Sequence, residues 1–194
     1  MVIRQKSQHI AKDEPESIQQ RIFSQMRFCR DQVPLPNVSA EAWCVYDPVG
    51  RLLHGKLSNH KREVASLTKM MTFLVSWEVF QKYFPEEHTV KITVPASCCG
   101  VPGTSAFLKP DETFTMHQLF YAMLLPSGND AALVLADFFG KVLMENNPGQ
   151  ALAKSLQFQD NQPVRHFLRE MNVVSQRLGM TNSIFDTPHG LANP

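Results

Sequence analysis

Apolar and polar positions recur along the chain with two different periods, and the longer period dominates. Apolar residues recur every three or four positions over residues 115–125, 130–144 and 164–178, which is the spacing of one helical face. A further apolar segment begins near Ser66 and has large side chains on nearly all sides, so it predicts a central, buried helix. These segments together predict a group of helices that share one core.

The shorter period, of two residues, is found in brief segments rich in strand-forming residues. Residues 42–46 and 51–55 flank the turn sequence of residues 47–50, and they predict a hairpin. Residues 89–94 predict another short strand, and residues 184–191 predict a strand-like piece followed by a turn. Because two strands alone do not form a stable sheet, the hairpin requires further strands or a helix against it.

The N-terminal part differs from the remainder of the chain. Residues 1–13 are polar, and residues 14–33 have apolar side chains at helical spacing. Prolines within residues 34–36 end this helix, because a proline disfavours helical backbone in the residue before it. We therefore predict an extension with one amphipathic helix over residues 1–36 and a domain over residues 37–194.

Composition narrows the possible functions only a little. The 194 residues have a formal net charge of +1, with 43% hydrophobic and 19% charged residues, which is ordinary for a globular protein. A charge so close to zero gives no electrostatic reason to expect nucleic acid as a partner. No apolar run approaches the ~18 residues of a transmembrane segment. Because Met1–His9 is polar, no signal peptide is visible, and the cytoplasm is the default expectation. These patterns do not predict an oligomeric state.

The first candidate for chemistry is the pair Ser66 and Lys69, at the expected start of the second helix. Residues three apart lie on one helical face, so the hydroxyl and the amine can meet. A serine becomes a good nucleophile when a base takes its proton. Burial and the positive end of a helix dipole both lower the pKa of a lysine and so make it a usable base. The same spacing also fits a helix-capping serine followed by a surface lysine.

The second candidate is Ser127-Gly128-Asn129, in a short loop between two apolar helices. A loop held at both ends by buried helices can fix polar side chains at a site. The Ser127 hydroxyl could relay a proton to a leaving amine, and the Asn129 amide could bind both a substrate carbonyl and the lysine. Taken alone, the tripeptide is also typical of an ordinary turn. His189 is interpreted as a turn or packing residue and not as a base.

An S-x-x-K followed by S-x-N resembles the serine penicillin-recognising enzymes. The chain further resembles the D-alanyl-D-alanine carboxypeptidases of peptidase family S11, the low-molecular-mass penicillin-binding proteins, in order from about residue 40 to its end. The resemblance rests on residues 65–72, 124–132, 171–172, 178–180 and 188–191. It implies an α+β fold of the β-lactamase/transpeptidase type, in which a helical region adjoins an incomplete antiparallel sheet.

The resemblance also implies acyl transfer through a serine ester. Ser66 matches the nucleophile, Lys69 matches its base, Ser127 matches the second catalytic hydroxyl, and Asn129 matches a substrate-binding residue. The implied partners are peptides that end in D-Ala-D-Ala, together with β-lactams that acylate the same serine. Neither a metal nor an organic cofactor is implied.

The chain departs from the family in one respect, because no Lys-Thr-Gly follows Asn129. In the family this third motif helps bind the substrate carboxylate and supplies one oxyanion donor, whose loss typically costs about 10²–10³ in rate. We therefore expect residues 37–194 to form the N-terminal portion of such a domain, without its C-terminal strands. Three interpretations follow: an active carboxypeptidase-type hydrolase completed elsewhere, an inactive member or binding module, and a β-lactamase-like hydrolase of other amides or esters. A binding module could use the helix of residues 14–33.

Overall fold

A computed structural model describes residues 18, 20–22, 24–25, 37–146 and 162–191. The chain divides into two units, Met1–His60 and Lys61–Pro194, and each is described by itself. In the first unit the residues described before position 37 are helical, and Ile18 and Ile22 are exposed. The rest of the helix predicted over residues 14–33 lies outside the described residues. The boundary between residues 36 and 37 stays a prediction.

The predicted hairpin is confirmed. Strand β1 (Trp43–Tyr46) pairs antiparallel with β2 (Leu52–Lys56). The Asp47 side chain closes the turn, since its carboxylate accepts the N–H groups of Val49 at 3.0 Å and Arg51 at 2.8 Å. Both bonds are local, which is how an Asp side chain stabilises a turn.

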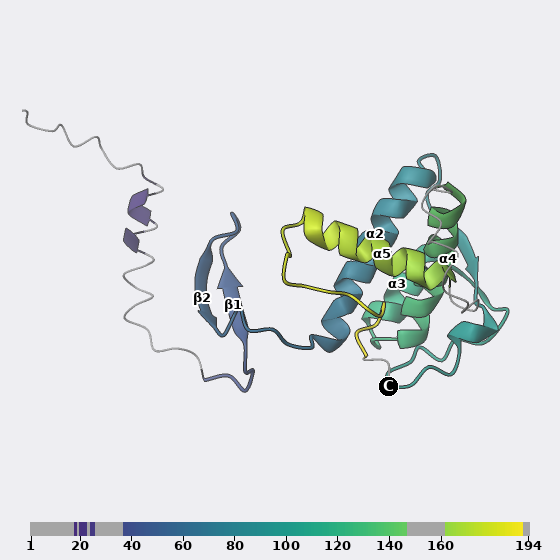
Figure 1. Cartoon of the computed structure of the whole chain (residues 1–194), viewed down its shortest axis with the longest axis horizontal. Coiled ribbons are helices and arrows are strands. Elements are labelled where there is room, and N and C mark those ends of the chain that lie inside the picture. The colour runs from purple at the N-terminus through teal and green to yellow at the C-terminus, as the bar shows by residue number, and fades with distance from the viewer. Residues whose placement is uncertain (1–17, 19, 23, 26–36, 147–161, 192–194) are drawn as a thin grey trace, which may run out of the picture. The chain divides into compact units, whose positions relative to one another are not determined.

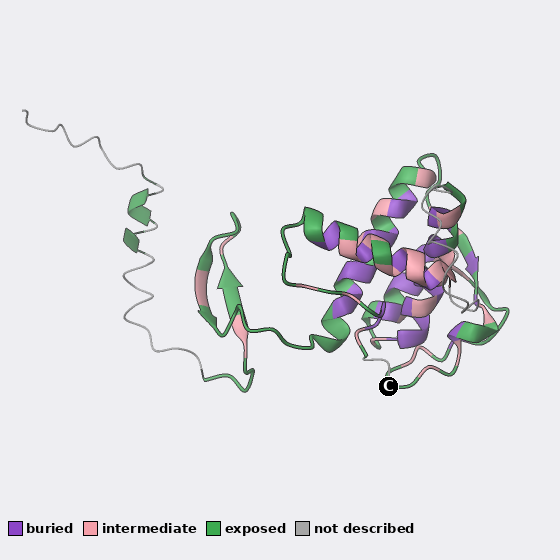
Figure 2. Ribbon diagram, viewed as in Figure 1, coloured by how far each residue is buried: buried purple, intermediate pink, exposed green. Residues whose placement is uncertain are grey.

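Four α-helices lie in the described residues of the second unit, and α4 is the central one. Helix α4 packs against each of the other three, and α5 lies across α2 and α4 in Figure 1. Buried residues line the faces that these helices share (Figure 2). None of the helices in the described ranges is long and apolar enough to cross a bilayer. The four are α2 (Thr68–Tyr83), α3 (Met116–Leu124), α4 (Asn129–Asn146) and α5 (Gln162–Arg177).

The prediction that α2 would be a central, buried helix is wrong for one of its faces. Val75 and Phe80 lie in the core, but Met70 is 67% exposed and Phe73 and Trp77 are each 37% exposed. When apolar residues occur all around a helix, any face of it could be buried. The pattern therefore does not identify which face packs against the core. Packing against α4 and α5 covers the inner face of α2 and leaves this strip on the outside.

A second, smaller ladder precedes α3. Strand β3 (Lys91–Thr93) pairs antiparallel with β4 (Thr113–Thr115), which places the buried Ile92 opposite Phe114. The strand predicted over residues 89–94 is thus present but shorter. The sequence pattern missed β4, because three residues are too few to show a period of two. Its last residue, Thr115, also caps α3 by accepting the N–H of Gln118 at 3.2 Å.

The strand-like piece predicted in residues 184–191 is wrong. Residues 184–185 have no regular structure, and residues 186–189 form bends. The Asn172 side chain of α5 donates to the carbonyl of Phe185 at 2.7 Å and accepts its N–H at 2.9 Å. A side-chain amide therefore satisfies the backbone that a neighbouring strand would otherwise pair. The segment continues to Thr187, Pro188 and His189, all of which are buried.

Candidate active site

Ser66 and Lys69 stand at the start of α2, in two different environments. A 3-10 turn over Ala65–Leu67 leads into the helix, with Ala65 in the left-handed region at φ +47°. Ser66 is exposed on this turn and makes no capping bond to the helix, whereas Lys69 is only 2% exposed. The alternative of a capping serine with a surface lysine is therefore wrong.

The structure brings all four predicted site residues together around one amine. Lys69 Nζ donates to Asn129 Oδ1 at 2.7 Å, to Ser66 Oγ at 3.0 Å and to Ser127 Oγ at 3.2 Å. The Ser127 hydroxyl in turn donates to Ser66 Oγ at 2.8 Å. Two residues from the start of α2 and two from the loop before α4 thus share one hydrogen-bonded cluster.

The Ser127–Asn129 loop keeps its shape through contacts with residues 102–104. Ser127 has a left-handed backbone with φ +59°, which is costly for a residue with a side chain. Thr104 Oγ1 donates to the Ser127 carbonyl at 2.5 Å, and the Thr104 carbonyl accepts the N–H of Asn129 at 2.8 Å. The Asn129 side chain also donates to the carbonyl of Pro102 at 2.8 Å, so its oxygen is turned toward Lys69.

The electrostatics of the cluster lower the pKa of the Lys69 amine. Burial lowers the pKa of Lys69 below its ordinary value, and the negative charge of Asp130 partly opposes this effect. Among the ion pairs of residues 37–146 and 162–191, none includes Lys69. The amine is thus surrounded by neutral oxygens and loses its proton more easily than a surface lysine does.

A turn over residues 187–190 completes the surroundings of Lys69. The backbone carbonyl of His189 lies 3.4 Å from Lys69 Nζ, and the Pro188 carbonyl accepts from Thr72 Oγ1 at 2.6 Å. Gly190 is essential to this fit, because a side chain there would collide with the carbonyl of Ala65. Sequence reasoning recognised this segment as a family signature but missed its contact with the lysine.

The imidazole of His189 makes a hydrogen bond within the turn. Its Nδ1 accepts the N–H of Leu191 at 3.1 Å, which places the remaining proton of the neutral ring on Nε2. Burial is the main cause that lowers the pKa of His189, the nearby Lys69 lowers it further, and Asp186 opposes both. The interpretation of His189 as a turn and packing residue is confirmed.

Sequence reasoning also missed Asp130, the residue directly after Asn129. Its side chain is 1% exposed and accepts from Ser105 Oγ at 2.6 Å, from the N–H of Ala106 at 2.9 Å and from the N–H of Leu108 at 3.1 Å. Burial acts to raise the pKa of Asp130, but these bonds outweigh burial and lower it. The available signal was an acidic residue in the first turn of a helix.

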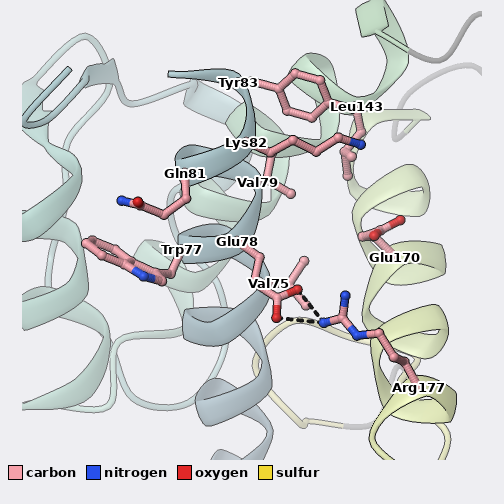
Figure 3. A pocket seen from close by; sticks show the side chains of 10 residues that line it. All are labelled: Val75, Trp77, Glu78, Val79, Gln81, Lys82, Tyr83, Leu143, Glu170 and Arg177. Atoms are coloured by element: carbon pink, nitrogen blue, oxygen red, sulfur yellow. Dashed lines mark hydrogen bonds and ion pairs between the residues drawn. The ribbon is translucent and has the colours of Figure 1, made fainter. Parts of the chain in front are cut away.

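One pocket lies away from this cluster. It has a volume of about 610 Å³ and runs between α2 and α5, where Glu78 and Arg177 point toward each other and pair at 2.6 Å (Figure 3). A second pocket, of about 390 Å³, lies against Ala65 and Thr68. None of the four predicted site residues lines either pocket. No group of three metal-binding side chains occurs among the described residues.

Comparison with solved structures gives the fold class. The crystal structure of the Streptomyces K15 DD-transpeptidase is similar with a TM-score of 0.64 and 26% identity, covering 83% of this chain and 56% of that one. Penicillin-binding protein 5 from Haemophilus influenzae is similar with a TM-score of 0.63 and 26% identity, covering 84% and 42%. The predicted α+β fold of the β-lactamase/transpeptidase type is confirmed.

The sequence comparisons give the family. The D-alanyl-D-alanine carboxypeptidase family model, peptidase S11, matches residues 29–194, and the chain belongs to this family. D-alanyl-D-alanine carboxypeptidase DacC of Escherichia coli K12 is 31% identical over 180 residues, covering 89% of this chain and 40% of that protein. The D-alanyl-D-alanine carboxypeptidase of Streptomyces sp. K15 is 28% identical over 162 residues, covering 83% and 50%. The chain thus spans half or less of the length of these curated relatives.

Proposed function

We propose that this chain performs the acyl-transfer chemistry of a serine-type D-Ala-D-Ala carboxypeptidase, with Ser66 as its nucleophile. The observation that carries the proposal is the position of Lys69. Its buried amine lies 3.0 Å from Ser66 Oγ and 3.2 Å from Ser127 Oγ, and its pKa is lowered by burial. A base within hydrogen-bonding distance of an exposed hydroxyl is the arrangement that nucleophilic catalysis requires.

In the acylation step, neutral Lys69 takes the proton of the Ser66 hydroxyl. Ser66 Oγ then forms a bond to the carbonyl carbon of the penultimate D-alanine, and the bond from this carbon to the nitrogen of the last D-alanine breaks. The proton held by Lys69 passes through the Ser127 hydroxyl, 3.2 Å away, to the leaving amine. Lys69 then removes a proton from a water molecule, whose oxygen forms a bond to the carbonyl carbon of the ester. The bond from this carbon to Ser66 Oγ breaks, and Ser66 Oγ takes the proton back from Lys69.

Asn129 is proposed to bind the substrate and to orient the base. Its Oδ1 holds the Lys69 amine at 2.7 Å, and its Nδ2 lies against the Pro102 carbonyl at 2.8 Å. Nδ2 carries two N–H groups, so one remains for a substrate carbonyl. The substrate class is peptides that end in D-Ala-D-Ala, and β-lactams acylate the same serine because their strained amide takes the place of the scissile bond.

Incubation of the full chain with a fluorescent penicillin tests the proposal. We expect one covalent adduct per chain, which peptide mass spectrometry assigns to Ser66, and we expect no adduct in Ser66→Ala. Ser58→Ala, at an exposed serine outside the site, serves as the matched control and keeps the adduct. Well-folded protein that forms no adduct would contradict the proposal and favour a binding role.

Turnover is measured separately, as D-alanine released from an acylated tripeptide that ends in D-Ala-D-Ala. An adduct without release of D-alanine places this chain among acylating but non-hydrolysing proteins. Release from other amides or esters, with none from the tripeptide, favours a β-lactamase-like hydrolase.

A further inference from the structure

An exposed row of apolar side chains runs along one face of α2 and begins directly after Ser66. Their spacing of three or four residues places them on a single side of the helix. Trp77, the last of them, extends from α2 on the side away from Arg177 of α5, so α5 does not cover this face (Figure 3). The row consists of Leu67, Met70, Phe73 and Trp77.

Helix α3 lies beside this face of α2 and runs in the opposite direction. The rings of Trp77 and His117 are 6.4 Å apart, and those of Phe73 and Phe120 are 4.5 Å apart. Closer to the start of α2, the two serine hydroxyls of the site are 2.8 Å apart. Each step back along α2 is thus matched by a step forward along α3, and both helices lead to the catalytic cluster.

The surface between the Phe73–Phe120 contact and the serines is apolar. Met70 is one turn before Phe73, and Leu124 is one turn after Phe120, so both lie in this interval. The only charged residue within residues 67–73 and 120–126 is Lys69, and it is buried. The exposed large side chains here, which we call the apolar patch, are Leu67, Met70, Phe73, Leu124 and Leu125.

The size of the apolar patch suits a small ligand and not a protein. The helix rises about 9 Å from Leu67 to Phe73, and packed helices stand about 8–10 Å apart, so the patch covers on the order of 100 Å². A stable protein interface needs about 800 Å² from each partner. Because the patch begins beside Ser66, a group bound on it lies close to the carbonyl that this serine attacks.

We propose that the apolar patch binds an apolar group on the acyl side of the substrate and thereby decides which acyl donors react fastest with Ser66. This inference rests on the proposed role of Ser66 as the nucleophile. The leaving group of that reaction is D-alanine, whose only apolar part is a methyl group, so a larger apolar group can come only from the acyl part. The preferred substrates are then peptides with an aromatic or long aliphatic group before D-Ala-D-Ala, and penicillins with an aromatic side chain.

Two penicillin probes that differ in this group test the proposal. Benzylpenicillin carries a phenylacetyl group, and 6-aminopenicillanic acid has the same ring system without it. The readout is the ratio of their rates of acylation of the full chain, measured by intact-protein mass spectrometry. We expect Met70→Gln to reduce this ratio about tenfold, the lower end of what apolar contacts contribute to discrimination between substrates. A general distortion of the site would slow both probes and leave the ratio unaltered.

Val173→Gln is the matched control, because Val173 is an exposed apolar residue on α5 and lies outside the patch. We expect it to leave the ratio unchanged. Leu124→Gln repeats the test from α3 and should lower the ratio as Met70→Gln does, so the test does not depend on the folding of one variant. A ratio that is unchanged in both patch variants, or that falls equally in Val173→Gln, would overturn the proposal.

A binding measurement that needs no acyl transfer separates this inference from the proposed function. The full chain is labelled with ¹³C at the methionine methyl groups, and the Met70 signal is identified by its absence in Met70→Gln. We expect N-phenylacetyl-D-alanine to shift this signal, because an aromatic ring lies against the methyl group, and N-acetyl-D-alanine at the same concentration to leave it in place. Met180, which is exposed outside the patch, is the internal control and should respond to neither compound.

The outcomes of the two experiments differ for the two proposals. If the Met70 signal responds to neither compound, or equally to both, the inference fails even where penicillin acylates Ser66. If it responds only to the phenylacetyl compound while neither penicillin forms an adduct, the patch is supported as a binding surface and the proposed function fails. A Met70 signal that moves with protein concentration alone would assign the patch to self-association and overturn the inference.

Discussion

The two serine-bearing segments of the site present their hydroxyls to Lys69 at nearly equal distances but by different means. Ser66 Oγ lies 3.0 Å and Ser127 Oγ lies 3.2 Å from the amine. Ser66 is exposed on a 3-10 turn, and the strained left-handed residue is its neighbour Ala65. Ser127 is half-buried and carries the left-handed backbone itself.

Distance to the base therefore does not separate a nucleophile from a relay, whereas hydrogen-bond direction and exposure favour one assignment. The Ser127 hydroxyl donates to Ser66 Oγ, so Ser66 does not use its own proton in this bond and can give it up to Lys69 once the amine has lost a proton. Ser66 is also exposed to solvent, from which a substrate arrives, while Ser127 is half-buried. This asymmetry favours Ser66 as the nucleophile and Ser127 as the relay.

The largest expected effect comes from removal of the Lys69 amine, the proposed base, which contacts both serines. We expect Lys69→Met to slow penicillin acylation about 10²–10⁴-fold, the usual contribution of a positioned general base. The measurement is the rate of adduct formation by intact-protein mass spectrometry. Lys82→Met is the control, because Lys82 is on the same helix and lies over the Tyr83 ring. An unchanged rate in Lys69→Met would show that another group activates Ser66.

The comparison of the two serines is sharpened by Ser127→Ala. We expect the adduct to remain on Ser66 but to form more slowly, by up to about 10²-fold, because the amine then lacks a relay to the leaving group. Peptide mapping of the adduct and its rate of formation are the two readouts. An adduct lost as completely as in Ser66→Ala, in folded protein, would contradict the division of roles.

The sequence predicted the four side chains that meet around Lys69 better than it predicted the backbone groups that surround them. The S-x-x-K and S-x-N motifs combine residue types that few sites share, so Ser66, Lys69, Ser127 and Asn129 could be named in advance. The surrounding groups are backbone carbonyls, such as those of Pro188 and His189, and any residue type can supply a carbonyl. Their positions depend on the path of the chain, which local patterns do not encode.

The fold shows the same division. Helix α4 was predicted because its apolar spacing continues over many residues, and the β1–β2 hairpin because Asp47 and Gly50 mark its turn. The three-residue strand β4 had no period to detect. A turn was predicted near the end of residues 184–191, but its contact with Lys69 was not. Residues 184–186 contain strand-forming side chains, but the pairing that they lack is made by the Asn172 amide. Tertiary contacts decided these segments.

A smaller effect is expected where α2 meets the turn of residues 187–190. Thr72→Val keeps the shape of the side chain and removes the donor to the Pro188 carbonyl at 2.6 Å. We expect a loss of about 1–3 kcal/mol in the free energy of unfolding, because a buried carbonyl is left unpaired. Chemical denaturation measures the change in the free energy of unfolding. The rate of acylation should fall only if the turn of residues 187–190 no longer holds its position beside Lys69.

Ser76→Ala is the matched control for this prediction. Ser76 is one turn further along the same helix and is fully buried, and its hydroxyl has no hydrogen-bond partner among the described residues. Its removal should therefore leave stability unchanged or increase it. A loss in Ser76→Ala equal to the loss in Thr72→Val would mean that the Pro188 contact contributes nothing specific.

The smallest expected effect concerns His189 and acid. Since the folded-state pKa of His189 lies below its ordinary value, the unfolded chain binds more protons between the two pKa values. Stability therefore rises with pH through this window and falls on acidification below about pH 6.5, the ordinary histidine pKa.

In His189→Asn the amide oxygen can accept the N–H of Leu191 without titrating. We expect this variant to lose less stability than the original chain between pH 7.5 and pH 5, measured by denaturation at each pH. If both proteins lost equal stability over this pH range, the buried His189 ring would take up its proton in the folded state at no cost in free energy. The turn around Lys69 would then be less tightly packed than the geometry indicates.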